Sequence, residues 1–520
     1  MKTTEPSQKL HNSLKEDKGR KIDPVTTVIP MICILIVCLY FIIAPEQSTR
    51  MLADIRFFLG DTFGSYYLMV GLGTVLISLY LSFSDIGNIV LGGQEEKPLY
   101  GFWLWGAMVF TCGLAADILF YSLCEWIYYS QEAHVLAMGP MEEWAGTYTL
   151  FHWGPTPWSF YAVLAAAFGF MLHVRGVRKQ KFSEACRPIL KEKTDGIWGK
   201  VIDVLAIFAL IAGTGTTFSV ATPLLARAIP SIFGAQVTSK WLTICILIAV
   251  CVTYTISVMH GIKGVEKLSN ICMALFGALL AYVFLFGGQI RFTIENGLTS
   301  IGNVFQNFIA LSTWTDPLRE TNFPQVWTIF YWAYWIVWCV AAPFFMGQVS
   351  RGRTVRQVIL GSYLFGIAST YVSFIILGNY GLGAQMAGKF DFISIYTATG
   401  DLYETILRIL ETLPMHRIVL VLLVLSMIAF YASSFDSITL VACQYSYKET
   451  DGSEASLRMK LFWAVFLIFL PIALIFSEGS MNNLQTVSII AAFPLAMVIM
   501  LIIASFIKDA KSFLRETRRG

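Results

Sequence analysis

Charged side chains are scarce in this 520-residue chain: they make up 14% of it, against 56% for hydrophobic residues. A soluble chain carries about 25% charged residues, so the composition excludes a protein that is surrounded mainly by water. The net charge of +3 says little, and no nucleic-acid partner is expected. We therefore expect the lipid bilayer to surround most of the chain.

Signals of metal binding and of catalysis are also lacking. The ten Cys are scattered without a C-x-x-C pair and the six His are dispersed, so we predict no metal site and expect the cysteines to be small buried hydrophobes. The sequence has no P-loop, no dinucleotide-binding fingerprint and no Gly-x-Ser-x-Gly elbow. We expect neither an enzyme nor a resident cofactor.

Long apolar runs take up most of the chain instead. The first 22 residues are polar and rich in Lys, with no apolar stretch followed by a cleavage site, so no removable signal peptide is expected. About twelve later runs have roughly the 20 residues that cross the hydrocarbon of a bilayer. All are expected to be helices, because only a helix satisfies its own backbone in lipid. The predicted spans are 27–46, 66–92, 101–130, 158–175, 201–223, 240–260, 268–289, 325–346, 357–380, 415–441, 459–477 and 485–507.

Basic residues mark one side of the predicted membrane protein. Lys and Arg near the ends of spans stay on the cytoplasmic side of a membrane, and the loop 131–146 has three Glu but no Lys or Arg. We predict an even number of spans in the inner (cytoplasmic) membrane, with both termini in the cytoplasm. The basic clusters are the N-terminal tail, 175–200, Lys263 with Lys267, 351–356, and 508–519. The predicted parts are a tail at 1–26, a transmembrane domain at 27–507 and a short basic tail at 508–520.

Two amphipathic segments lie outside the predicted spans, at 301–311 and 402–413. Each precedes a span, and such helices usually lie along the membrane interface. Two spans followed by two five-span halves, 101–289 and 325–507, would fit an inverted repeat. In that architecture the substrate binds at the midplane, between broken helices.

Aromatic residues gather at two places. In 330–338, Phe-Tyr-Trp-Ala-Tyr-Trp-Ile-Val-Trp, Trp332, Trp335 and Trp338 recur every three residues and share one broad face of a helix. Residues 151–161, Phe-His-Trp-Gly-Pro-Thr-Pro-Trp-Ser-Phe-Tyr, open the fourth span at its outer end. An aromatic belt at the membrane interface is an alternative explanation, but the first group lies within a span rather than only at its rim.

These two groups could form an aromatic box. A permanent cation without N–H donors cannot be held by ordinary hydrogen bonds. The negative faces of aromatic rings attract it, by about 2 kcal/mol or more per ring when desolvated. The pattern therefore predicts a quaternary ammonium ligand.

Along nearly its whole length the sequence resembles the betaine/choline/carnitine transporter family. The matching motifs are Phe-His-Trp-Gly at 151–154 with Pro157-Trp158, the aromatic run 331–338, and Ser-Arg-Gly-Arg-Thr at 350–354 after the eighth span. The resemblance implies an all-α membrane protein of about twelve transmembrane helices, with a leucine-transporter-like 5+5 inverted repeat preceded by two helices. It also implies a homotrimer.

The resemblance further implies which residues bind the substrate. One position departs from the family pattern, because Tyr334 stands where a Trp is frequent. The matched residues are Trp332, Tyr334, Trp335 and Trp338 in a central box, Trp153, Trp158 and Tyr161 in a second aromatic group, and Tyr128, which matches a Tyr that lines the site in carnitine exchangers.

The third predicted span carries two carboxylates. Asp117, in the stretch Gly-Leu-Ala-Ala-Asp-Ile at 113–118, stands where betaine carriers of the family have Gly and choline carriers have Asp. This implies a cationic substrate or a proton as coupling ion. A carboxylate within a span is costly and usually functional; alternatively, Asp117 faces a water-filled vestibule or caps a kink. Glu125, eight residues further on, matches a Glu of the carnitine exchangers.

The coupling ion stays open between Na+ and H+. Sodium-coupled members of the family supply hydroxyls from the tenth span, and this chain has two there, with further hydroxyls in the fifth span. Alternatively, such hydroxyls bond to their own backbone or bridge helices. In the carnitine exchangers an Arg replaces the sodium, and Cys272 stands at that position here. The candidate residues for a coupling ion or proton are Ser433, Ser434, Thr214, Thr216, Thr217, Asp117 and Glu125.

These observations predict a secondary transporter, either an exchanger or an ion-coupled symporter, for a trimethylammonium compound such as carnitine, γ-butyrobetaine, choline or glycine betaine. An amino-acid transporter of the same fold is the nearest alternative, and it would bind an amine through exposed helix ends rather than indole rings. A substrate-gated receptor, or a membrane enzyme acting on lipid head groups, is less well supported, because no signalling domain and no catalytic constellation is recognised.

Overall fold

The computed structural model describes residues 21–113, 115–235, 239–259, 262–448, 455–476 and 481–518. The predicted N-terminal tail up to residue 20, the last two residues of the predicted basic tail, and the side chains of Lys263 and Lys267 lie outside the described residues. Within the described ranges the regular structure is helical, and extended backbone pairs only at two isolated bridges, Ile22 with Tyr447 and Val90 with Thr354. The predicted all-α class is confirmed.

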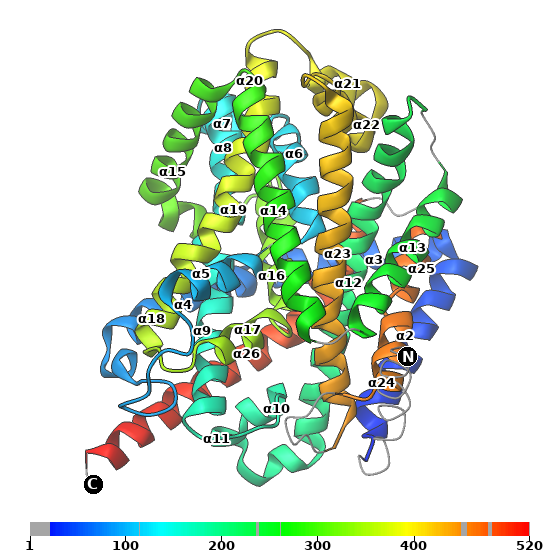
Figure 1. Ribbon diagram of the computed structural model, residues 1–520. Helices are drawn as coiled ribbons and strands as arrows, with labels where there is room; N and C mark the ends of the chain where they lie inside the picture. The colour runs from blue at the N-terminus through cyan, green and yellow to red at the C-terminus, as the bar shows by residue number, and fades with distance from the viewer. Residues whose placement is uncertain are drawn as a thin grey trace, which may run out of the picture.

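The helices are long and stand roughly side by side, with α14 and α23 adjacent at the front of the view and α26 crossing obliquely in its lower part (Figure 1). In chain order they are α2 Pro24–Ile43, α3 Pro45–Phe57, α4 Gly64–Phe83, α5 Phe102–Thr111, α6 Ala116–Tyr129, α7 Ala133–Met138, α8 Met141–His152, α9 Pro155–His173, α10 Phe182–Ala185, α11 Arg187–Leu190, α12 Ile197–Ile232, α13 Lys240–Met259, α14 Ile262–Phe286, α15 Ile290–Thr313, α16 Ile329–Trp338, α17 Ala342–Val349, α18 Val355–Gly361, α19 Ile367–Ser373, α20 Asn379–Met386, α21 Phe392–Thr399, α22 Leu402–Glu411, α23 His416–Ser446, α24 Leu457–Phe466, α25 Phe469–Phe476 and α26 Met481–Thr517. Wider π-helical turns are η2 Phe58–Thr62, η5 Pro324–Thr328, η6 Ser362–Gly366 and η7 Phe374–Gly378.

The number of membrane-crossing helices agrees with the prediction of about twelve. In the described part of the chain, eight helices are long and apolar enough to span a bilayer, three bent pairs also qualify, and α13 adds a shorter apolar helix. The largest difference in a boundary is at the fourth span, which begins at Met141 rather than at 158. There α8 runs on into α9, so the outer aromatic motif lies inside the span instead of at its start.

The two predicted amphipathic segments are helical. The first belongs to α15, which turns by 112° from α14 at a short break and lies at the edge of the bundle (Figure 1). The second is α22, whose N-cap Asp401 accepts hydrogen bonds from two backbone N–H groups of its first turn. Neither segment adds a span to the bundle.

Two membrane helices are broken near their middle. α5 and α6 meet at an angle of 70°, and the segment η5–α16 meets α17 at 56°. Each broken pair opens one of the two predicted five-span halves, which is the placement expected of discontinuous helices in an inverted-repeat transporter. A break exposes backbone groups and helix ends inside the bundle, so it marks the place to look for a binding site.

The two ends of the described chain lie on the same face of the bundle. The backbone N–H of Asp23 donates to the carbonyl of Ser446 at 2.8 Å, and the Lys181 ammonium donates to the neighbouring Tyr445 carbonyl at 3.0 Å. Near the other end, Arg175 forms an ion pair of 2.7 Å with Asp509. The basic segment that follows α9 thus contacts α26 directly and the start of the chain through the end of α23.

α9 and α17 approach each other through small residues. A Cβ placed on Gly347 would lie 2.7 Å from the backbone nitrogen of Gly169 and 2.8 Å from the carbonyl oxygen of Ala165. Lipid tails are as apolar as side chains, so helices in a membrane associate through close packing of this kind. The contact holds α17, the second half of the broken pair, against α9.

We expect Gly347→Ala to destabilise the protein by about 2 kcal/mol, because an added methyl in a tight contact forces backbone shifts. Thermal unfolding of the purified protein in detergent measures this. Gly73→Ala is the matched control, since a Cβ there would meet nothing within 4 Å. Equal melting temperatures for the two variants would show that the α9–α17 contact is not as tight as described.

Candidate binding site

The candidate site lies where α6 and α16 face each other beside the ends of α8 and α9. Figure 1 shows α16 behind α14, in the middle of the bundle. Trp153 follows the last residue of α8, Gly154 is the N-cap of α9 and Pro155 its first residue. A Cβ on Gly154 would lie 2.5 Å from the Leu150 carbonyl oxygen. Glycine is therefore needed at this turn, which brings Trp153 and the first turns of α9 to one place.

Three aromatic rings surround Trp335 of α16, so that four rings meet at one place. Its ring centroid lies 5.6 Å from that of Trp153, 5.5 Å from that of Trp158 and 5.1 Å from that of Tyr161. The planes cross at 59° to 71°, so that ring edges meet ring faces, as the charge distribution of aromatic rings favours. This group of Trp153, Trp158, Tyr161 and Trp335 is called the cage below.

Two indole N–H groups of the cage are donors without an acceptor. The Nε1 atoms of Trp158 and Trp335 are buried and make no hydrogen bond in the described structure. Trp158 is also held from behind, because a Cβ on Gly366 would lie 2.2 Å from its Cε3 atom. Buried donors without a partner are rare in native proteins, and here they belong to the residues predicted to bind a ligand.

Asp117 lies beside the cage, in the first turn of α6. Its Oδ2 atom accepts a hydrogen bond from the Tyr334 hydroxyl, whose oxygen lies 2.5 Å from Thr217 Oγ1 on α12. The Oδ1 atom is buried and has no partner in the described structure, and no described Lys or Arg forms an ion pair with this carboxylate. Asp117 is therefore equipped to hold a proton or to face a cation.

Glu125 lies two turns further along α6 and is also buried. Its Oε2 atom accepts the indole N–H of Trp153 at 2.7 Å, and its Oε1 atom accepts the Tyr129 hydroxyl at 2.6 Å. Glu125 thus fixes the orientation of one cage ring. A change in the charge of Glu125 would directly alter its hydrogen bond with Trp153.

Two other predicted site residues on α16, Trp332 and Trp338, lie apart from the cage. Trp332 packs with its ring centroid 5.3 Å from that of Phe151, and Trp338 lies against Gly213 of α12, where a Cβ would be 3.4 Å from its Nε1 atom. Each step of three residues turns a helix by about 60° short of a full turn. The three Trp residues therefore fan out around α16 instead of forming one wall.

Tyr128, at the end of α6, also lies away from the cage. Its ring centroid is 4.9 Å from that of Trp327 in η5 and 5.8 Å from that of Tyr396 in α21. Glu132 accepts the indole N–H of Trp327 at 2.7 Å. These residues close the bundle on the side of α21 and α22.

The hydroxyls considered for a coupling ion have mixed surroundings. Thr214 donates to the Leu210 carbonyl at 2.6 Å. Thr216 donates to the Ala212 carbonyl at 3.0 Å. These are the backbone bonds that Ser and Thr commonly make in membrane helices. Ser433 and Ser434 lie in α23 and are partly buried, and Cys272 is buried.

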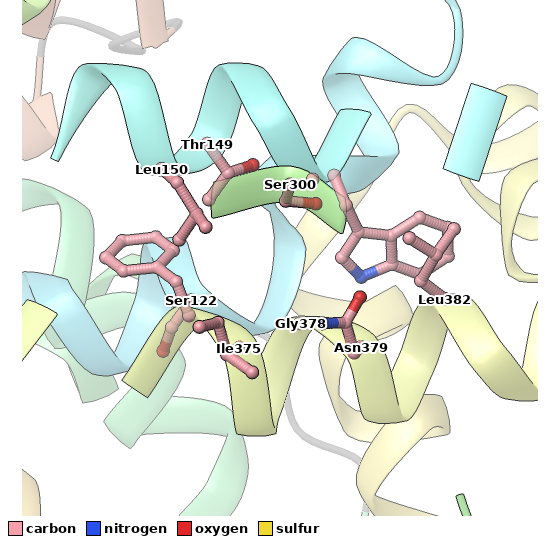
Figure 2. Close-up of a pocket in the computed structure, with 11 residues that line it drawn as sticks. Ser122, Thr149, Leu150, Ser300, Ile375, Gly378, Asn379 and Leu382 are labelled. Atoms are coloured by element: carbon pink, nitrogen blue, oxygen red, sulfur yellow. The ribbon is translucent and has the colours of Figure 1, made fainter. Parts of the chain in front are cut away.

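A small cavity lies among α6, α8, α15 and the η7–α20 segment (Figure 2). It is lined by Ser122, Thr149, Ser300 and Asn379 among others, and its volume of about 20 Å³ is room for roughly one water molecule. A trimethylammonium group does not fit such a volume. The cavity is a gap in the packing behind α6 and not part of the cage.

Tyr129, His152 and Thr328 adjoin the site but were not singled out from the sequence. His152 stands in the Phe-His-Trp-Gly motif, and its ring nitrogens lie 2.6 Å from the Tyr129 hydroxyl oxygen and 3.0 Å from Thr328 Oγ1. The feature of the sequence that points to His152 is its position next to Trp153. Its connection to α6 and η5 depends on the fold.

Comparisons with known proteins show the family to which this chain belongs. The family model described as "BCCT, betaine/carnitine/choline family transporter" matches residues 25–514. The chain is 31% identical to the glycine betaine transporter OpuD of Bacillus subtilis (strain 168) over 496 residues, which cover 93% of both proteins. It is 26% identical to a carnitine transporter of Acinetobacter baumannii over 472 residues, covering 88% of this chain and 83% of that protein.

A betaine/ectoine transporter, LcoP of Corynebacterium glutamicum, is 28% identical over 456 residues, covering 86% of this chain and 70% of that protein. Among solved structures, a Na+-coupled sialic acid symporter has a TM-score of 0.46 and 14% identity, over 86% of each chain. The family model describes transporters, and the relatives are transporters and not enzymes. The chain belongs to the betaine/carnitine/choline transporter family.

Proposed function

We propose that this protein is a secondary transporter that carries a trimethylammonium compound, such as carnitine, γ-butyrobetaine, choline or glycine betaine, across the inner membrane. The observation that carries this proposal is the meeting of four aromatic rings at Trp335, next to the buried carboxylate of Asp117. Aromatic faces attract a quaternary ammonium group, which has no N–H to donate.

The charge of the site favours a positively charged group. Burying an ionised carboxylate without a partner costs several kcal/mol, and Oδ1 of Asp117 has no partner in the described structure. A bound cation offsets this cost. Tyr334 positions the carboxylate through its hydroxyl. Tyr128 and Trp338 lie apart from the cage, and we assign them to the substrate path, Tyr128 on the outer side of the cage and Trp338 on the inner side.

The orientation follows from the basic residues. Lys181 and Arg175 lie on the face where both ends of the described chain are fastened, and basic residues next to spans stay in the cytoplasm. We therefore assign that face to the cytoplasm, and the face with α7, α21 and α22 to the outside. Family resemblance favours a homotrimer.

The coupling ion is Na+ or H+ in this proposal. Ser433, Ser434, Thr214 and Thr216 are the candidate sodium ligands, although the last two donate to their own helix. Asp117 and Glu125 are the candidate proton sites. A hydroxyl that donates to a carbonyl still has lone pairs for a cation, so the bonds alone do not decide between the two ions.

Counterflow in proteoliposomes tests the function. We expect vesicles loaded with unlabelled carnitine, choline or glycine betaine to take up the same labelled compound without any ion gradient, because the carrier exchanges substrate across the bilayer. Proline serves as the control for an amino-acid transporter. Entry of labelled proline, with no entry of any trimethylammonium compound, would replace the proposal by that alternative.

The cage predicts a large effect of one tryptophan. We expect Trp335→Leu to raise the apparent transport constant about ten- to thirtyfold, since one desolvated cation–π contact is worth about 2 kcal/mol. Trp332→Leu is the matched control, because Trp332 is equally buried but packs against Phe151. We expect it to lower the amount of folded protein more than the affinity. Similar transport constants for the two variants would argue against the cage.

The position of Asp117 beside the cage predicts that its substitution affects the affinities for cationic and zwitterionic substrates differently. Asp117→Asn removes the negative charge at nearly constant size. We expect the apparent affinity for choline, a cation, to fall about tenfold more than the apparent affinity for glycine betaine, because the carboxylate of glycine betaine is repelled by Asp117. A charge contact of this kind is worth about 1–3 kcal/mol. Competition against one labelled substrate measures both affinities. Equal losses would assign Asp117 a structural role.

A further inference from the structure

A chain of hydrogen bonds connects α6, α8 and η5 behind the cage. Glu125 Oε1 lies 2.6 Å from the Tyr129 hydroxyl oxygen, which lies 2.6 Å from His152 Nδ1. His152 Nε2 lies 3.0 Å from Thr328 Oγ1. All four side chains are buried. Every polar atom along the path from Thr328 to Glu125 is therefore within hydrogen-bond distance of the next.

With Glu125 ionised, the direction of each hydrogen bond is determined. The Tyr129 hydroxyl donates to Oε1 of Glu125. Because that hydroxyl has one hydrogen, His152 must donate from Nδ1 to the Tyr129 oxygen, and its Nε2 atom then accepts from Thr328. His152 is a neutral imidazole in this state, and each hydrogen has an acceptor.

A proton that arrives at the Thr328 oxygen reverses the chain, because the original Thr328 hydrogen then passes to Nε2 of His152. The hydrogen on Nδ1 passes to the Tyr129 oxygen, and the original Tyr129 hydrogen passes to Oε1 of Glu125. Afterwards Glu125 donates to Tyr129, Tyr129 donates to Nδ1, and Nε2 donates to Thr328. His152 is neutral before and after, one proton has reached Glu125, and the same three contacts are hydrogen bonds in both states.

His152 is the basic side chain nearest to Glu125 along the chain of hydrogen bonds. Among the described residues, the ion-pair contact of Glu125 is with His152, at 4.0 Å. Burial lowers the pKa of His134, in α7 on the outer side, to about 4, so its ring is neutral near pH 7 and adds no charge. The other titratable groups that face the chain are Tyr121, Cys124 and Tyr128 of α6, Glu132, Tyr148 of α8 and Tyr331 of α16.

We propose that Thr328, His152, Tyr129 and Glu125 form a path that delivers a proton from the outer side to Glu125, and that this proton is the ion coupled to transport. The proposal rests on the proposed function and names its coupling ion. Glu125 also accepts the indole N–H of Trp153, so neutralising the carboxylate weakens that bond and changes the cage. The proton thereby acts on substrate binding through one ring.

The test uses the full-length protein in proteoliposomes without sodium on either side. Uptake of labelled choline with acid outside is compared with choline counterflow at equal pH, and a trapped pH dye reports proton entry. We expect the wild type to accumulate choline and to acidify the interior. Tyr129→Phe removes the hydroxyl that both proton transfers cross, and we expect it to lower the ratio of proton-driven uptake to counterflow by about a hundredfold.

Tyr148→Phe is the matched control. Tyr148 is buried in the same region, but its hydroxyl pairs with His134 at 2.6 Å and is not in the chain of hydrogen bonds. The ratio of proton-driven uptake to counterflow in Tyr148→Phe is therefore expected to stay within about twofold of the wild type. A wild-type ratio for Tyr129→Phe, or uptake that ignores the pH gradient while counterflow is intact, would overturn the proton path and leave the proposed function standing. Lack of counterflow with every trimethylammonium compound would overturn the proposed function.

Discussion

The cost of burying two carboxylates on one membrane helix organises the centre of this protein. An ionised group in such surroundings is tolerated only when other groups satisfy it. In the described structure no Lys or Arg pairs with Asp117 or Glu125, and hydroxyl and indole groups donate to them instead. The positions of Tyr334, Tyr129 and Trp153 follow from this need. Trp153 of the cage is thus held in place by one of the carboxylates that give the site its charge.

The helix breaks serve the same purpose. Asp117 lies in the first turn of α6, directly after the break from α5, where the unpaired N–H groups of a helix start favour negative charge. The opposite break, between α16 and α17, follows Trp338. Each break places a helix end, with its unpaired backbone groups, inside the bundle, which a continuous helix cannot do.

The fold could be predicted because its signals are local: apolar runs of sufficient length, basic clusters and aromatic motifs. The sequence placed Trp335 and Trp158 in predicted spans that are helical in the structure, and it placed Trp153 before the fourth predicted span, whereas Trp153 lies between α8 and α9. It could not show that Trp332 turns away to Phe151, since helical spacing gives an angle and not the neighbour that occupies it. Nor could it connect His152 to Thr328, 176 residues apart, because that contact depends on how two halves of the chain pack.

That last bond has a further consequence. Glu125, Tyr129 and His152 belong to the first predicted half of the transporter, and Thr328 starts the second, so the His152–Thr328 contact is the one link of the chain that crosses between them. Hydrogen bonds weaken steeply beyond their usual length. Rocking of one half against the other would therefore disconnect the relay as the carrier turns inward, and the membrane would stay insulated against a leak of protons.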